Sequence, residues 1–101
     1  MGCSMEKYGI QSVVVEEIIA LAQKYNLDKV ILFGSRARDD YKTRSDIDLA
    51  VCGGDSVRFS VDVQECTSTL LFFDVVNLDG MVQEELLESI KREGIVLYEK
   101  I

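Results

Sequence analysis

A Gly-Ser pair between two apolar runs, the second of which opens with two aspartates, constrains this chain most. Gly34 and Ser35 follow the apolar run 29–33, ten residues intervene, and Asp46 and Asp48 then begin a second apolar run. Because side chains alternate between the two faces of a strand, Asp46 and Asp48 are expected on the same face. The pattern predicts two strands of one sheet, with a tight turn after the first strand and a carboxylate pair at the start of the second.

This combination of residue types indicates a particular chemistry. Two carboxylates held close together repel each other unless a cation lies between them. Hard divalent cations with oxygen ligands, above all Mg²⁺, suit the Asp46–Asp48 pair. Gly34 and Ser35 at a strand end offer backbone N–H groups to an anion. A phosphate site facing a dicarboxylate metal site predicts chemistry on a nucleoside triphosphate, although a solvated charged pair and a turn-forming glycine remain the simpler alternatives.

A third acidic residue and two arginines extend the candidate site. Asp74 lies in the apolar run 71–76, where a lone carboxylate is costly to bury without a partner. We expect it beside the other two aspartates, the alternative being a strand-end residue that reaches water. Arg36 and Arg38 are two positions apart and do not share a helix face, so at most one is expected to reach a triphosphate. Arg36 is the preferred candidate.

Apolar periodicity and turn signals predict alternating helices and strands. Helices are expected over 11–25 with Ser12 as N-cap, over 35–39, from Asp55 or Ser56 with a stripe formed by Phe59, Val63, Cys66 and Leu70, and over 81–93, and strands over 29–33, 46–52, 71–76 and 95–98. The expected fold is α/β: a small mixed sheet of about four strands, with helices packed mainly on one face. Residues 1–101 are expected to form a single domain in which 1–9 are disordered.

Composition limits the classes of partner. The net charge of −7 argues against direct nucleic-acid binding, which needs a basic face. No stretch approaches the roughly 20 apolar residues of a membrane span, so a cytoplasmic location is expected. The three cysteines show no metal-ligand spacing and are expected as reduced thiols, two of them buried.

Three segments resemble a known family. They are Gly34-Ser-Arg-Ala-Arg38, Ser45-Asp-Ile-Asp-Leu-Ala-Val51 and Phe73-Asp-Val-Val-Asn-Leu78. They are similar to the minimal nucleotidyltransferases, the MNT group of the DNA polymerase β-like nucleotidyltransferase superfamily, and the resemblance extends over about residues 12–99. It implies the polymerase β-like nucleotidyltransferase fold.

The resemblance also implies an activity and assigns roles to the site. A nucleoside monophosphate, AMP in the leading reading, would move from ATP or another NTP to a protein hydroxyl. Asp46, Asp48 and Asp74 would hold two Mg²⁺ ions, with Mn²⁺ as a substitute, and Asp74 could take the proton of the acceptor. Gly34, Ser35 and Arg36 would bind the nucleotide.

A partner is implied in the same way. Proteins of the MNT group are commonly paired with a helical HEPN-domain protein, which suggests an antitoxin that modifies a HEPN toxin. Two other readings remain open: a non-catalytic antitoxin that acts by binding, and the nucleotide-binding subunit of a split small-molecule nucleotidyltransferase. The sequence leaves the preferred base and the oligomeric state open.

Overall fold

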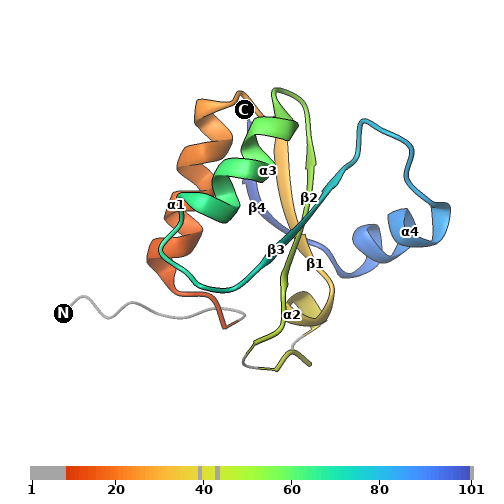
Figure 1. Ribbon diagram of the computed structural model, residues 1–101. Helices are drawn as coiled ribbons and strands as arrows, with labels where there is room; N and C mark the ends of the chain where they lie inside the picture. The colour runs from red at the N-terminus through yellow and green to blue at the C-terminus, as the bar shows by residue number, and fades with distance from the viewer. Residues whose placement is uncertain (1–8, 39, 43, 101) are drawn as a thin grey trace.

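Helices and strands alternate along the chain (Figure 1). The computed structural model describes residues 9–38, 40–42 and 44–100. The helices are α1 (Ser12–Lys24), α2 (Ser35–Arg38), α3 (Ser56–Glu65) and α4 (Glu84–Glu93), and the strands are β1 (Lys29–Phe33), β2 (Ile47–Cys52), β3 (Phe73–Asn77) and β4 (Ile95–Glu99). Every expected element is therefore present, and β1 has its expected bounds.

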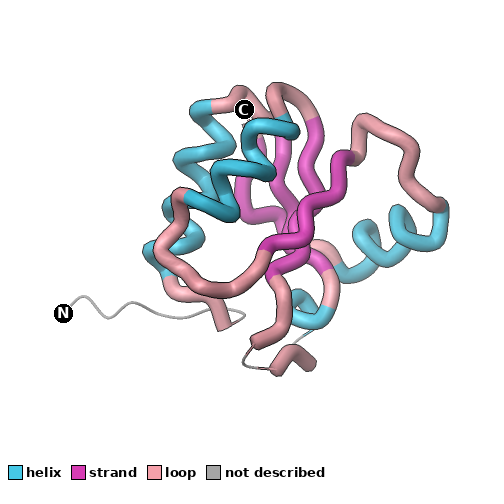
Figure 2. The backbone as a smooth tube through the Cα atoms, in the orientation of Figure 1, coloured by secondary structure: helices cyan, strands magenta, loops and turns pink. Residues whose placement is uncertain are grey.

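The strands form one mixed sheet in the order β3-β2-β1-β4 (Figure 2). β1 pairs antiparallel with both β2 and β4, whereas β2 pairs parallel with β3. The parallel pair is joined through α3, since a parallel connection has to cross back along the sheet. The starts of β2 and β3 consequently lie at the same end of the sheet as the end of β1.

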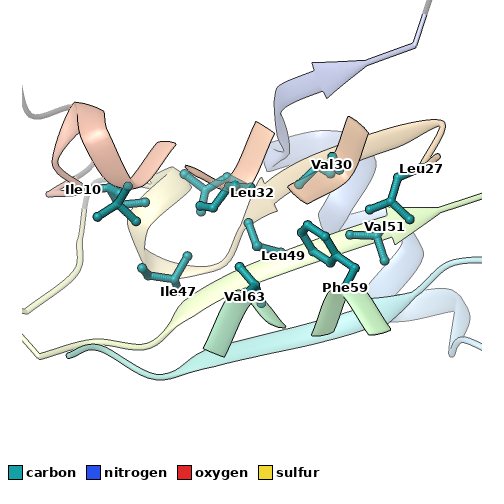
Figure 3. Close-up of a cluster of buried hydrophobic side chains, with 12 residues drawn as sticks. Ile10, Leu27, Val30, Leu32, Ile47, Leu49, Val51, Phe59 and Val63 are labelled. Carbon is teal, nitrogen blue, oxygen red and sulfur yellow. The ribbon is translucent and has the colours of Figure 1, made fainter. Parts of the chain in front are cut away.

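Helices α1 and α3 cover one face of this sheet (Figure 1). Alternate strand residues such as Leu32 and Leu49 are fully buried beneath them, together with Phe59 of α3 (Figure 3). Full burial of a side chain of this size stabilises the fold by about 1.5–3 kcal/mol. The hydroxyl of Tyr25 donates a hydrogen bond to Asp62 and links the end of α1 to α3.

Helix α4 packs on the opposite face. Ile90 is 4 % exposed and packs with Phe33 of β1 and Ala50 of β2. Because Ala50 faces α4, strand alternation places Asp48 on this same face. With two long helices on one face and one on the other, the helices lie mainly, but not entirely, on one side. The α4 face is the one that carries the candidate carboxylates.

Several local expectations were wrong. Gln11 is the N-cap of α1, and Ser12 is already helical. The start of α3 was predicted correctly: Asp55, one of the two expected caps, is the N-cap, and its carboxylate accepts a hydrogen bond from the Arg58 N–H at 3.2 Å. The helix then ends at Glu65, so the last two residues of its expected stripe do not pack on the sheet: Cys66 and Leu70 are exposed.

The other expectations concern cysteines, membrane segments and the N-terminus. Cys52 is half-buried and Cys66 exposed, both as free thiols, so neither is the buried thiol that was expected. In the described part of the chain, no helix is long and apolar enough to cross a bilayer. The expected disorder of 1–9 falls outside the described residues, apart from Gly9.

Candidate active site

Gly34 ends β1 in a conformation that suits glycine. Its φ is +77°, a left-handed conformation that side-chain-bearing residues rarely adopt. A Cβ at this position would collide with the carboxylate of Asp48. The glycine therefore allows the backbone of the turn to lie directly against that carboxylate.

Asp48 and Asp74 lie side by side on neighbouring strands. They are register partners in the parallel pair β2·β3, so both side chains project from the same face of the sheet. Asp48 is also the register partner of Phe33, the residue before Gly34. The sheet thus brings the two aspartates and the Gly34 turn to one end.

Asp74 is exposed, because β3 is an edge strand. We expected burial to force Asp74 to have a partner, and that reasoning was wrong, because the side chain is exposed. Its position beside Asp48 comes from strand register instead. Asp46 lies two residues before Asp48, just ahead of β2, and is exposed as well.

The electrostatics of Asp48 reflect this crowding. Burial and then the charges of Asp74 and Asp46 raise the pKa of Asp48 from 3.8 to about 6. Arg38 and Arg36 oppose the shift in part. The charges of Asp46 and Asp74 thus disfavour the ionised form of Asp48, the most buried of the three.

A divalent cation suits this set chemically, since all the donors are carboxylate oxygens and a cation would relieve the repulsion at Asp48. Within the described residues, however, no three or more acidic, histidine or cysteine side chains are gathered closely enough to hold a metal ion. The sheet fixes Asp48 and Asp74 as neighbours, while the exposed side chains of Asp46 and Asp74 are not fixed as a ligand cluster. The expected convergence of three carboxylates is thus not preformed.

Ser35 begins α2 immediately after Gly34. The Gly34 carbonyl accepts the Arg38 N–H at 3.1 Å, and the Ser35 carbonyl accepts the Asp40 N–H at 3.0 Å. These bonds form the tight helical turn that directly follows β1. Four residues make too short a helix for a strong dipole, so a bound anion here would depend on backbone N–H groups and a nearby side-chain cation.

Arg36 does not have the position expected of a nucleotide ligand. It is 1 % exposed, and its guanidinium donates to the Ser45 carbonyl at 2.7 and 3.2 Å and to the Gly9 carbonyl at 3.2 Å. Its guanidinium also lies 4.9 Å from the centre of the Tyr41 ring. Arg36 therefore links the polar loop before β2 to α2, which is a structural role next to the candidate site.

Of the two arginines in the motif, Arg38 is the one that lies on the surface. Its side chain is 45 % exposed and forms ion pairs with Glu93 at 3.0 Å and Asp40 at 3.3 Å. These two contacts raise the pKa of Arg38, the hydrogen bond to Glu93 most. The sequence contained Arg38 in the motif, but Glu93, 55 residues away, carries no local signal of its proximity.

Comparison with known proteins agrees with the chemistry that these residues suggest. Residues 16–101 match the family described as "Polymerase beta, Nucleotidyltransferase". This chain belongs to that family. It is therefore an enzyme of the nucleotidyltransferase class, and the resemblance drawn from Gly34-Ser and Asp46-Ile-Asp is confirmed at the family level.

One similar sequence and two similar structures are informative. A Methanocaldococcus jannaschii protein named "Putative protein adenylyltransferase MJ0604" is 36% identical over 100 residues, which cover 87% of this chain and 97% of that protein. A toxin–antitoxin crystal structure with AMP-PNP has a TM-score of 0.70 at 22% identity, covering 85% of this chain and 73% of its own. A Shewanella oneidensis structure has a TM-score of 0.64 at 14% identity, covering 87% and 71%. At these identities the structures show the shared fold.

Proposed function

We propose that this nucleotidyltransferase moves AMP from ATP to a hydroxyl group of a partner protein, in a reaction that requires Mg²⁺ or Mn²⁺. The observation that carries the proposal is the pairing of Asp48 with Asp74 beside the Gly34 turn. The name of the M. jannaschii relative supports a protein acceptor. The toxin–antitoxin structure with AMP-PNP supports an adenine nucleotide and a toxin partner.

The proposed reaction is an in-line displacement. The acceptor oxygen attacks the α-phosphorus in line, a new P–O bond forms, and the bond to the bridging oxygen breaks to release pyrophosphate. The turn at Gly34 and Ser35 holds the β- and γ-phosphates through backbone N–H groups. Arg38, which lies one helical turn further on the surface of α2, supplies positive charge to the departing pyrophosphate.

The aspartates serve the other half of the reaction. Asp46, Asp48 and Asp74 would hold the divalent ions, which when bound neutralise phosphate charge and acidify the acceptor hydroxyl. Asp74, exposed on the edge strand, is open to an incoming acceptor and receives its proton. Asp48 is the most buried of the three, and strand register and the close contact with Gly34 fix its position.

The acceptor in this proposal is a tyrosine of a HEPN-type helical toxin, which makes the chain an antitoxin. The exposed edge strand β3 favours a protein acceptor, because a large partner can approach Asp74 from solvent. The experiment is intact-mass spectrometry of a HEPN-domain toxin after incubation with this protein, ATP and Mg²⁺. AMP adducts on the partner that disappear with Asp46→Asn support the proposal.

Glu88→Gln is the matched control, because it removes one carboxylate from the exposed side of α4 and should leave adduct formation intact. A stable complex without adducts under any nucleotide would contradict the enzymatic role and favour an antitoxin that acts by binding. Adducts on a small-molecule hydroxyl, with none on the protein, would instead favour the split small-molecule enzyme.

A further inference from the structure

An ion pair joins the candidate phosphate turn to the far end of the chain. Nη1 of Arg38 in α2 lies 3.0 Å from Oε2 of Glu93, the last residue of α4. Arg38 is also tied to the turn through its backbone, since its N–H donates to the Gly34 carbonyl. The contact therefore links α4 directly to the segment that would hold the triphosphate.

Glu93 is the better-anchored partner in this pair. Its side chain is 21 % exposed, against 45 % for Arg38. One turn earlier on α4, Ile90 is buried against Phe33 at the end of β1, and the Ile90 carbonyl accepts the Gly94 N–H at 2.7 Å. The backbone that carries Glu93 is thus fixed to the same strand that ends in the phosphate turn.

The position of Glu93 is otherwise unfavourable. A carboxylate in the last turn of a helix lies at the negative end of the helix dipole, which disfavours its charge. The Arg38 guanidinium offsets this charge at 3.0 Å, closer than the guanidinium of the neighbouring Arg92 at 3.7 Å. Asp40, the other ion-pair partner of Arg38, is 61 % exposed on a loop and offers a less fixed contact. Glu93 is therefore the contact that determines where the Arg38 side chain lies.

We propose that Glu93 is a positioning residue for the nucleotide: it holds the Arg38 guanidinium beside the Gly34 turn, ready to meet the triphosphate. This inference rests on the proposed function. An arginine has several rotatable bonds, and ordering such a side chain on binding costs about 0.5–1.5 kcal/mol. Because Glu93 orders Arg38 before the nucleotide arrives, loss of Glu93 should weaken triphosphate binding by the corresponding factor of about 2–10.

Calorimetric titration of the whole protein with ATP and Mg²⁺ tests the inference. Glu93→Gln should raise the Kd about 2- to 10-fold, whereas Glu88→Gln, which removes the same charge from α4 without touching Arg38, should leave it unchanged. In an Arg38→Gln background, Glu93→Gln should have no further effect on the Kd. A purely structural role for Glu93 would instead lower the thermal midpoint and weaken binding equally in both backgrounds.

The possible results separate the two proposals. If wild-type protein binds ATP and Glu93→Gln binds it as tightly as Glu88→Gln, or more tightly, the positioning role is overturned while the proposed function stands. A tighter complex would mean that Glu93 competes with the triphosphate for Arg38. If the wild-type protein binds no ATP with Mg²⁺, both proposals are overturned.

Discussion

At the scale of single residues, the close approach of Gly34 to Asp48 is the constraint that organises the site. Sequence alone predicted a phosphate site at Gly34 and a metal site at Asp48, because a glycine after a strand and an i, i+2 aspartate pair are local patterns. It favoured Arg36 over Arg38 as the nucleotide ligand, whereas the folded chain buries Arg36 and leaves Arg38 on the surface. This difference depends on the Ser45 and Gly9 carbonyls, which reach Arg36 only in the folded chain.

Gly34→Ala should destabilise the protein by about 2–3 kcal/mol, because the backbone has a positive φ and the new Cβ would displace the Asp48 carboxylate. Gly80→Ala is the control, since a Cβ there would lie 3.6 Å from the Asn77 carbonyl, an ordinary contact. Urea denaturation of both variants measures the difference. Equal stability of the two variants would contradict the close approach.

Asp48→Asn should abolish transfer and, without metal, stabilise the protein at neutral pH. The raised pKa means that folded protein keeps a proton on Asp48 up to about pH 6, whereas unfolded chain loses it near the ordinary value of 3.8. The free energy of unfolding therefore falls as the pH rises from about 4 to 6, by about 1–2 kcal/mol after allowance for solvent screening. Urea denaturation in EDTA at pH 4 and pH 7 should show the variant more stable only at pH 7. Destabilisation at both pH values would show that Asp48 is structural.

At the scale of elements, apolar periodicity predicted which segments are helix or strand, but tertiary contacts decided where they end. Cys66 and Leu70 have the spacing of the α3 stripe, yet the helix stops at Glu65. The Thr67 hydroxyl bonds to the Val63 carbonyl at 2.7 Å, and Ser68 turns toward Glu17 of α1 with contacts of 2.7 and 2.8 Å. Such side-chain bonds compete with helix continuation, and the partner on α1 is not visible in the local sequence.

The loop that leads to β2 should depend on Arg36. Arg36→Met removes the hydrogen bonds that the guanidinium donates to the Ser45 and Gly9 carbonyls, so it should lower the free energy of unfolding by about 2–4 kcal/mol. Arg58→Met is the control: its ion pair with Asp55 is exposed and should contribute about 0–1 kcal/mol. Thermal denaturation compares the two variants. A loss no larger than that of the control would contradict the supporting role of Arg36.

At the scale of the whole molecule, charge sets the conditions for binding. The chain carries a net charge of −7, and the site adds the local repulsion of three aspartates. A triphosphate brings further negative charge to the same end of the sheet, where Arg38 is already paired with two carboxylates. Close charges of one sign repel strongly at the low effective dielectric of a partly buried site. We therefore expect the protein alone to bind a bare triphosphate poorly.

ATP binding should consequently require a divalent cation. Calorimetry at one fixed ionic strength should give clear binding with Mg²⁺ and a much weaker or undetectable signal in EDTA. Asp48→Asn should reduce the difference in ATP affinity between the two conditions. It should weaken binding with Mg²⁺, because it removes a ligand for the cation, and strengthen binding in EDTA, because it removes part of the repulsion that the bare nucleotide meets. Glu88→Gln, which changes the net charge by the same amount away from the site, should keep the full difference between the two conditions. Equal ATP affinity with Mg²⁺ and in EDTA would show that the aspartates do not act as metal ligands, and that the turn and Arg38 suffice for the nucleotide.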